Sequence, residues 1–448
     1  MSYGRLLRFI LPLVITSIVM ELGSQVLNGG MARVPEATTT LAAFGLGWGL
    51  ILFLSAPLVQ SRELGLMLVN DHATLAAVRR FIILAGCTLM VALASLTLTP
   101  VGDWVIEGLH GVDASLGATV RTALFWLIPY PLLKGLSYFH AGLLLRVRHT
   151  AVVSYATLSN LTVSILMVFA LVTLPWVHAQ PIRLPIVVTY GGLLVELAII
   201  LWGVVRYVRP TLPVQDAAGT PPPSMLTIVR FFWPLALIML TQELSRPMIN
   251  LFVARGPDAT NALAILAVLY TLGRMPYGWL NDIRNLGPAF RDEADSRHFI
   301  QRFAVGCGLV SLAMMGIFFW TPLRDVILLN WIGVPPHLAL LAAVPLHLFA
   351  GFSIAVTARA YFHGIALVEH RTRALAPSAP ARLLAILATL IVLPVSGVAG
   401  ATMGVAALLA GFSIEALVVW WGVRGHDWLR HRTQLADVSK PGDARLIR

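Results

Sequence analysis

Charged side chains recur inside stretches of this sequence that are otherwise strongly apolar. Such stretches contain Glu21, Lys134, Glu196, Glu243, Arg246, Arg274, Asp282, Arg284, Arg359, Arg382 and Glu415. A charge in apolar surroundings is costly, so each of these residues marks a binding site, an ion pair or a helix end. The ones expected to face a cavity are mainly arginines. Arginine binds carboxylate or phosphate through two parallel hydrogen bonds and stays charged at any working pH, so the pattern predicts an anion site.

Arg246 is the strongest candidate for that site. It lies in the segment QELSRPMIN, where Pro247 removes a backbone donor and bends a helix. Freed carbonyls and a fixed cation would together form an anion site. The alternative is an ion pair between Arg246 and Glu243, which lies three residues earlier on the same helix face. A resting pair that opens when the anion binds would satisfy both interpretations.

Polar side chains also follow one face of each of two helices. The positions are Glu21, Gln25 and Asn28 in the first helix, and Gln242, Arg246 and Asn250 in the second. Spacings of four, seven and eight residues keep side chains on a common face of a helix. We therefore expect the two faces to line one cavity. The alternative is hydrogen bonding between neighbouring helices, which is common in membrane bundles.

A third group of candidates lies in the segment GRMPYGWLNDIR and in a pair of other helices. Pro276 and Gly278 interrupt the segment, and irregular backbone at membrane depth needs protein or a water-filled cavity around it. The further expected contacts to the anion are Arg274, Tyr277, Asn281, Lys134 and Arg359. Lys134 and Arg359 are expected to line the cavity from opposite sides. Glu196 and Glu415 are interpreted as structural, with Arg382 pairing to Glu415.

The elements that position these residues are predicted to be membrane helices. The chain has 448 residues, of which 58% are hydrophobic and only 12% charged, with a mean hydropathy of +0.81. A soluble domain carries roughly twice that charged fraction. Apolar runs of about 20 residues, the length that crosses a bilayer, recur along the whole chain. The runs are continuous rather than alternating, which favours an all-α polytopic membrane protein over a barrel.

Twelve spans are predicted from these runs. They cover residues 8–31, 38–60, 78–100, 117–145, 151–175, 184–206, 229–254, 260–289, 300–322, 336–363, 374–394 and 398–424. Arginines concentrate in the loops on one side, together with the N-terminus and the C-terminal tail. The positive-inside rule places that side, and both termini, in the cytoplasm. The net charge of +11 is spread over these loops, so nucleic-acid binding is not predicted.

The sequence repeats at a constant offset, the one that separates Arg8 from Arg230. RFILPLVITSIVMELGSQVLNGGMARVPEA begins at Arg8 and RFFWPLALIMLTQELSRPMINLFVARGPDA begins at Arg230. We call two residues at this offset repeat-equivalent. We expect two six-helix lobes at 1–208 and 227–426, related by an axis along the membrane normal. The Pro-rich and Gly-rich stretch 209–226 is expected to be a cytoplasmic linker. The polar tail 427–448 is expected to be cytoplasmic and disordered after Trp428.

Catalytic and cofactor motifs are not found in the sequence. It contains no Walker A pattern, no Gly-rich dinucleotide fingerprint and no cluster of His and Cys at metal-ligand spacing. Cys87 and Cys307 both lie in apolar runs and are expected to be packing residues. An intramembrane enzyme or a non-transporting scaffold is a rival interpretation. Without a nucleophile and base at membrane depth, the chain is predicted not to be an enzyme and to need no cofactor.

Several segments resemble the progressive ankylosis family of transporters. They are LPLVITSIVMELGSQVLNGG at 11–30, FFWPLALIMLTQELSRPMINLFVAR at 231–255, AILAVLYTLGRMPYGWLNDIRNLGPAF at 264–290 and ATMGVAALLAGF at 401–412. That family belongs to the superfamily of multidrug and toxic-compound extrusion (MATE) antiporters and lipid-linked oligosaccharide flippases. The resemblance implies a V-shaped carrier that exports anions such as pyrophosphate, citrate and ATP. Glu243 and Arg274 depart from it, because a basic residue and a histidine are expected there.

The resemblance also implies a coupling site. Related antiporters use an acidic residue in the first helix of a lobe, and Glu21 and Glu243 are repeat-equivalent. They are the candidate coupling residues, for H⁺ or Na⁺. The expected function is secondary, alternating-access export of a small anionic metabolite across the plasma or bacterial inner membrane. The alternatives are a MATE-type cation or drug/proton antiporter and a lipid-intermediate flippase.

Overall fold

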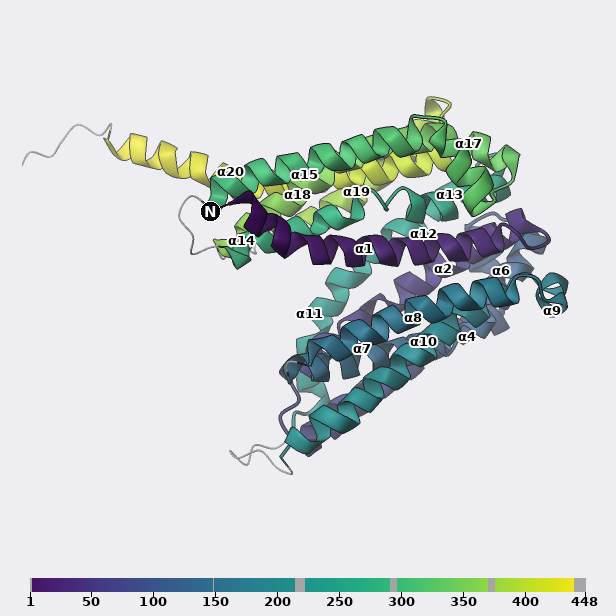
Figure 1. Ribbon diagram of the computed structural model, residues 1–448, viewed down its shortest axis with the longest axis horizontal. Helices are drawn as coiled ribbons and strands as arrows, with labels where there is room; N and C mark the ends of the chain where they lie inside the picture. Colours follow the sequence, from purple (N-terminus) through teal and green to yellow (C-terminus); the bar gives the residue numbers. More distant parts are fainter. Residues whose placement is uncertain (1, 148, 214–221, 291–295, 370–374, 439–448) are drawn as a thin grey trace, which may run out of the picture.

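The structure is a computed structural model that describes residues 2–147, 149–213, 222–290, 296–369 and 375–438 (Figure 1). Within these ranges the regular elements are all helical, and no strand occurs. The all-α prediction is therefore confirmed. The 214–221 stretch of the expected linker and residues 439–448 of the expected tail lie outside the described ranges.

The first part of the chain contains α1–α10 and two π-helical segments. Their bounds are α1 Tyr3–Met31, α2 Ala37–Val59, α3 Ser61–Met67, α4 His72–Leu98, α5 Pro100–Gly102, η1 Asp103–Leu109, α6 Ala114–Trp126, α7 Tyr130–Arg146, α8 Thr150–Leu171, α9 Pro175–Ala179, α10 Arg183–Gly203 and η2 Val204–Val208. A short 3₁₀ helix, η3, follows at Arg209–Thr211.

The second part repeats much of this order. Its elements are α11 Met225–Glu243, α12 Ser245–Ala254, α13 Ala259–Leu272, η4 Gly278–Asn285, α14 Leu286–Ala289, α15 Ser296–Phe319, α16 Leu323–Asp325, η5 Val326–Ile332, α17 Pro336–Leu348, α18 Ala350–Val368, α19 Ser378–Val395 and α20 Gly400–Val438. Helix α20 runs to Val438, so residues 429–438, which we expected to be disordered, are helical. Helical hydrogen bonds simply continue along this polar stretch.

The number of membrane spans is supported in part. Eight helices of the described chain are long and apolar enough to cross a bilayer, or ten if each of two bent pairs counts as one span. The bent pairs are α6 with α7, at 43°, and α17 with α18, at 40°. The other two predicted spans correspond to α1 and to α13, a shorter apolar helix. The predicted interruption after α13 is present, because η4 there is a 3₁₀ helix. The count of twelve stays a prediction.

The helices form two arms that meet at one end and separate toward the other (Figure 1). The N-terminus and the end of α20 lie at the open end. There, the first helix of each half reaches the opposite arm. Phe232 of α11 packs on Phe81 of α4 at a ring distance of 5.2 Å, while Phe9 of α1 contacts Phe290 beyond α14 at 5.6 Å. This exchange ties the arms together where they diverge. The lobe boundaries 1–208 and 227–426 stay a proposal.

The sequence repeat is also a structural repeat. Gly45 of α2 and Ala267 of α13 are repeat-equivalent, and they meet where the two helices cross. A Cβ on Gly45 would lie 2.6 Å from the Cβ of Ala267, so the helices approach closely through small residues. Glu36 and Asp258, another repeat-equivalent pair, both adopt left-handed backbone with φ of 51° and 53°. Equivalent residues in equivalent conformations on both sides of this crossing indicate a twofold axis near it.

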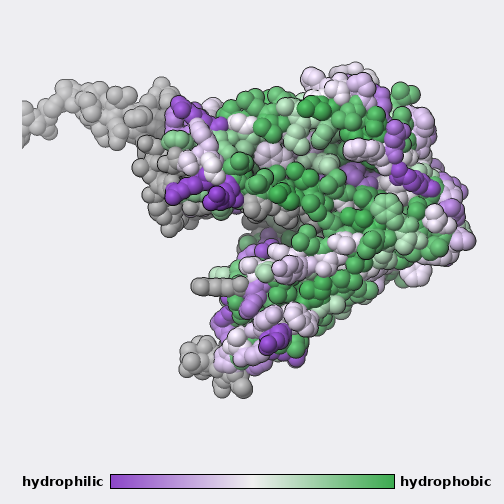
Figure 2. All heavy atoms as spheres, in the orientation of Figure 1, coloured by the Kyte–Doolittle hydropathy of each residue, from purple (hydrophilic) through white to green (hydrophobic). Residues whose placement is uncertain are grey.

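The outer surface matches a bilayer. Figure 2 shows apolar side chains over the sides of both arms and polar side chains gathered mainly at the ends of the molecule. Large apolar residues such as Phe169, Trp331 and Leu340 are 69%, 69% and 78% exposed on this surface. An apolar surface of this extent would be costly in water, and the membrane supplies the missing contacts. The chain is a multi-pass membrane protein.

Candidate functional site

A polar cavity of about 400 Å³ lies among helices of the second half. We call it the arginine cavity. It is lined by Ser17, Gln242, Glu243, Ser245, Arg246, Tyr270, Arg274, Tyr277, Gly278, Asn281, Asp282, Arg284, Arg359, Arg382, Leu408 and Phe412. The structure thus brings together seven of the predicted site residues from three separate stretches of sequence. Five arginines face only two carboxylates on this lining, so the cavity attracts anions.

Arg246 lies in the first turn of α12, directly after the break in the helix. Helix α11 ends at Glu243 and α12 begins at Ser245, so the backbone is interrupted beside the residue that we expected to bind the anion. The guanidinium lies over the ring of Tyr270, 5.0 Å from its centre. Within the described chain, Arg246 makes no ion pair with Glu243 or any other carboxylate. The resting ion pair that we considered is therefore not present in this conformation.

Arg359 and Arg382 share one buried carboxylate. Nη1 of Arg359 lies 2.9 Å from Oε2 of Glu415, and Nη1 of Arg382 lies 3.4 Å from the same oxygen. The expected pairing of Arg382 with Glu415 is thus present. Both guanidinium groups also lie over the ring of Phe412, at 4.8 and 4.4 Å. Nε of Arg382 is buried and has no acceptor among the described residues. One carboxylate for two arginines leaves a surplus positive charge at the cavity wall.

The equivalent cluster of the first half is neutral. Glu196 binds Nζ of Lys134 at 2.8 Å and accepts hydrogen bonds from Ser137, at 2.6 Å, and from Asn160. Asn160 is repeat-equivalent to Arg382, so the second half carries a cation where the first half carries an amide. This difference between the halves gives the second cluster its surplus charge.

Lys134 does not face the arginine cavity. It lines a separate cavity of about 250 Å³ in the first half. This corrects the expectation that Lys134 and Arg359 line one cavity from opposite sides. The physical reason is that each cation turns toward the buried carboxylate of its own helix bundle, since an unpaired buried charge would be costly.

The polar face on α11 and α12 connects two cavities. Gln242 and Arg246 line the arginine cavity, while Arg246 and Asn250 line a smaller one of about 140 Å³. Tyr270, whose hydroxyl donates to Oδ1 of Asn250 at 3.2 Å, borders both. Arg246 therefore lies at the junction between the cavities. Asn28 of α1 lines the smaller cavity as well, so the predicted convergence of the two polar faces occurs there.

The polar face on α1 is divided among different neighbours. Oε1 of Glu21 lies 3.0 Å from Nε of Arg274, and Nδ2 of Asn28 donates to the hydroxyl of Thr271 at 2.7 Å. Gln25 lies between them in sequence but lines a third cavity of about 350 Å³ with mostly apolar walls. The expectation that these residues face one cavity is therefore corrected. Successive turns of α1 meet different helices because α1 runs between the two halves.

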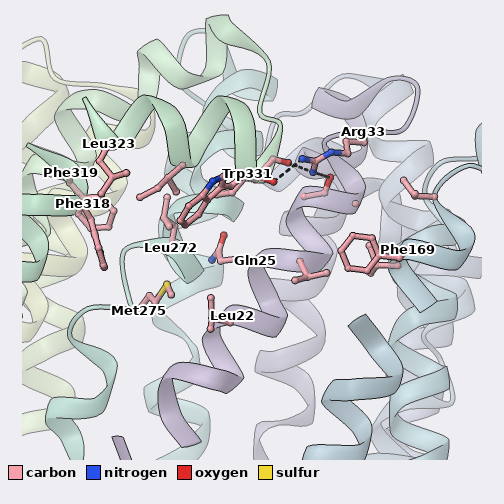
Figure 3. A pocket seen from close by; sticks show the side chains of 17 residues that line it. Leu22, Gln25, Arg33, Phe169, Leu272, Met275, Phe318, Phe319, Leu323 and Trp331 are labelled. Carbon is pink, nitrogen blue, oxygen red and sulfur yellow. Dashed lines mark hydrogen bonds between the residues drawn. The ribbon is translucent and has the colours of Figure 1, made fainter. Parts of the chain in front are cut away.

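The third cavity, which we call the apolar cavity, is shown in Figure 3. Leu22 and Gln25 of α1 face Leu272 and Met275 of the second half across it, and Phe169 of α8 borders it. Nε2 of Gln25 is buried and has no acceptor among the described residues. At the end of the cavity, Arg33 bonds to backbone carbonyls beside Trp331. The cavity therefore lies between the two halves.

Three further charged groups of the cavity wall were not among the predicted site residues. Arg382 was interpreted only as a structural partner, while Arg284 and Asp282 were given no role in binding. Asp282 accepts a hydrogen bond from Ser17 at 3.2 Å. The signal for Arg382 was available in the repeat, because it replaces the amide Asn160. In the described chain, no three His, Cys, Asp or Glu residues are placed to hold a metal ion.

Comparison with known proteins places this architecture. A family model described as "Progressive ankylosis protein (ANKH)" matches residues 1–321. An inward-facing MATE transporter of the MOP superfamily is similar over 96% of this chain and 99% of its own, with 14% identity and a TM-score of 0.64. The lipid II flippase MurJ, in an inward closed conformation, covers 93% of this chain and 87% of its own, with 11% identity and a TM-score of 0.69.

A third similar structure is a MOP superfamily transporter from Pyrococcus furiosus, for which reverse polarity of the binding pocket suggests a different function. It shares 14% identity over 94% of this chain and 96% of its own, with a TM-score of 0.55. At these identities the likeness shows the fold alone. The predicted MATE-like, V-shaped architecture is confirmed.

Proposed function

Because the chain belongs to the progressive ankylosis family, we propose that it is a secondary transporter that exports small polyvalent anions by alternating access. Pyrophosphate, citrate and ATP are the substrates to test. The observation that supports this most strongly is the guanidinium of Arg246, which lies at the junction of two cavities without a carboxylate partner in the described chain. Arginine is the side chain best suited to hold carboxylate or phosphate groups at such a place.

The charge balance of the arginine cavity supports an anionic substrate. Five arginines line it, together with the carboxylates of Glu243 and Asp282. Glu21 and Glu415, which bind cavity arginines, bring the acidic groups to four, so the net charge is one positive. A polyvalent anion would draw on several arginines at once and could displace the weakest internal pairs. A cationic substrate would meet this charge unfavourably.

The shape supports entry from the end that carries the termini. The arms separate at that end and meet at the opposite one (Figure 1). The positive-inside rule assigns the terminal end to the cytoplasm, so this conformation would be open inward. We propose that the anion enters from the cytoplasm and binds at Arg246. The arms would then close behind it and part at the other end. Glu21 and Glu243 are the proposed coupling residues, for H⁺ or Na⁺.

A lipid-intermediate flippase is the second candidate. The observation that favours it is the apolar cavity of about 350 Å³, because a flippase must house a lipid tail near a basic site. A MATE-type antiporter for cations is less well supported, since the cavity lining is dominated by arginines. The relative DinF-BH was solved in complex with the dye rhodamine 6G, which makes that dye a suitable probe of the antiporter alternative.

Efflux from proteoliposomes tests the proposal. Vesicles containing the purified protein would be loaded with labelled citrate, pyrophosphate or ATP, with and without a proton or sodium gradient. We expect at least one anion to leave faster than from protein-free vesicles. No efflux above that leak under any gradient would overturn the anion assignment. Translocation of a fluorescent lipid or of the rhodamine dye in parallel vesicles would then support one of the alternatives.

A further inference from the structure

Arg33 crosses from the first half of the chain to the second at the end of the molecule opposite the termini. Its Nη1 donates to the carbonyl of Ile332 at 2.7 Å, and its Nη2 donates to the carbonyls of Trp331 at 2.8 Å and Asn330 at 3.2 Å (Figure 3). Nη1 also donates to Gly29 of its own helix at 2.9 Å. One guanidinium thus joins the end of α1 to three carbonyls of η5.

Arg255 makes the reverse contact. It is repeat-equivalent to Arg33, and its Nε donates to the carbonyl of Leu109 at 2.6 Å. Leu109, at the end of η1, is repeat-equivalent to Trp331. The same arginine-to-carbonyl contact is therefore made twice between the halves, once in each direction. A chance contact on one side would not have an equivalent at the same offset on the other.

The receiving segments are built alike. Both η1 and η5 are π-helical, and each is followed within two residues by a glycine in left-handed backbone, Gly111 with φ of 69° and Gly333 with φ of 81°. A Cβ on Gly333 would lie 3.1 Å from Cζ of Arg33, and one on Gly111 would lie 3.4 Å from Cγ of Arg255. Glycine permits this backbone and this approach. The carbonyls at such a helix end lack partners and attract a cation.

Other arginines at this end behave differently. Arg121 pairs with Asp103 and Glu107 of its own half, and Arg324 pairs with Asp325 of its own half at 2.8 Å. Within the described chain, neither Arg33 nor Arg255 has a carboxylate partner. Their cations are held across the boundary by neutral carbonyls only. Such bonds hold the halves in place, and water can replace them when the halves part.

We infer that Arg33 and Arg255 are positioning residues that hold the two halves closed at the end opposite the termini and must release their carbonyls whenever that end opens. This inference rests on the proposed alternating-access function, because only a transport cycle requires the end to open. The two contacts are unequal, since Arg33 binds three carbonyls of the other half and Arg255 binds one. Loss of Arg33 should therefore have the larger effect.

A distance measurement between the halves tests this inference. Spin labels would be placed at Ser115 and His337, which are exposed, repeat-equivalent and close to the starts of α6 and α17. The native Cys87 and Cys307 would first be replaced by serine. In lipid nanodiscs without substrate, we expect the parent protein to give mainly a short distance. Arg33→Gln with Arg255→Gln should raise the ratio of long to short distances about tenfold, as expected for losing hydrogen bonds to a charged group.

Single variants and matched controls make the test specific. Arg33→Gln should shift the distribution more than Arg255→Gln. Arg33→Lys keeps the charge but lacks the fork that spans several carbonyls, so it should shift it as well. Arg121→Gln with Arg324→Gln removes two charges from the same end without touching the contacts between the halves, and it should leave the distribution unchanged.

Two outcomes would overturn the inference. One is a distance distribution of the Arg33 and Arg255 double variant that overlaps the parent's in a monodisperse sample. The other is an equal shift in the Arg121 and Arg324 control. The measurement needs no substrate, so a failure of anion efflux would leave its result readable. Efflux with an unchanged distance distribution would reject the arginine contacts and retain the transport proposal.

Discussion

The carboxylate of Glu21 in α1 lies 3.0 Å from Nε of Arg274, so the first half supplies a counter-charge to one of the five arginines of the arginine cavity. The two side chains are exposed to different degrees, Glu21 at 14% and Arg274 at 49%. A pair that is open on one side can separate when another anion approaches the arginine. The contact therefore connects the proposed coupling residue with the proposed substrate site.

Arg246→Gln should reduce anion efflux at least tenfold. The glutamine keeps a polar side chain but loses the charge and the fork that would hold the anion at the junction of the two cavities. Initial rates of efflux from proteoliposomes would be compared with those of the parent protein. Arg80→Gln, which removes an exposed arginine far from the cavity, is the matched control. Equal rates for the parent and Arg246→Gln would remove Arg246 from the site.

Glu21→Gln should abolish the response of efflux to an imposed gradient of the coupling ion. The amide cannot bind or release a proton, and it leaves Arg274 with its full charge for the substrate. We therefore expect efflux without a gradient to persist, with a lower KM for the anion. Rates would be measured with and without a proton gradient, and again with a sodium gradient. A variant that still responds to the gradient as the parent does would assign Glu21 a structural role.

Arg382→Asn should lower efflux without unfolding the protein. The substitution gives the second half the amide that the first half carries at the equivalent position, Asn160. Glu415 keeps Arg359 as a partner at 2.9 Å, so no carboxylate is left unpaired. We expect the melting temperature to change by less than about 4 °C, the effect of roughly 1 kcal/mol or less in a chain of this size. A folded variant with unchanged efflux would show that the surplus charge is not needed.

His110 should make the protein less stable on acidification. Burial lowers the pKa of His110 and the Arg255 guanidinium lowers it further, against a raising effect of its hydrogen bond to the carbonyl of Val105. The unfolded chain then binds a proton near the ordinary value of about 6.5, while the folded chain does so only at lower pH. Stability is thus present above that value and falls as the pH drops below it.

The measurement for His110 is the melting temperature between pH 7.5 and pH 5.5. We expect His110→Gln to reduce the loss seen in the parent protein. His72→Gln is the matched control, because it replaces an exposed histidine. The same pH dependence in His110→Gln and in the parent would reject the assignment of this loss to His110.

Several features follow from the sequence alone, because they depend on composition and local pattern. Continuous apolar runs require helices in a bilayer, since every backbone group must be paired within its own segment. The constant offset between the copies that begin at Arg8 and Arg230 identifies two halves without any coordinates. Pro247 and the segment around Pro276 mark the breaks after α11 and α13, because proline cannot continue the hydrogen bonds of a helix. Arg246 was therefore recognisable as a candidate before its surroundings were known.

The partners of the charged residues were decided only by the tertiary structure. Helical spacing states which side chains share a face, but not which helix lies opposite that face. Glu21, Gln25 and Asn28 share a face of α1 and yet meet three different surroundings, because α1 runs between the two halves. Lys134 and Arg359 looked equivalent but belong to separate cavities. Arg33 contacts carbonyls of η5, far along the chain in the second half, a pairing that only the packing of the two halves could select.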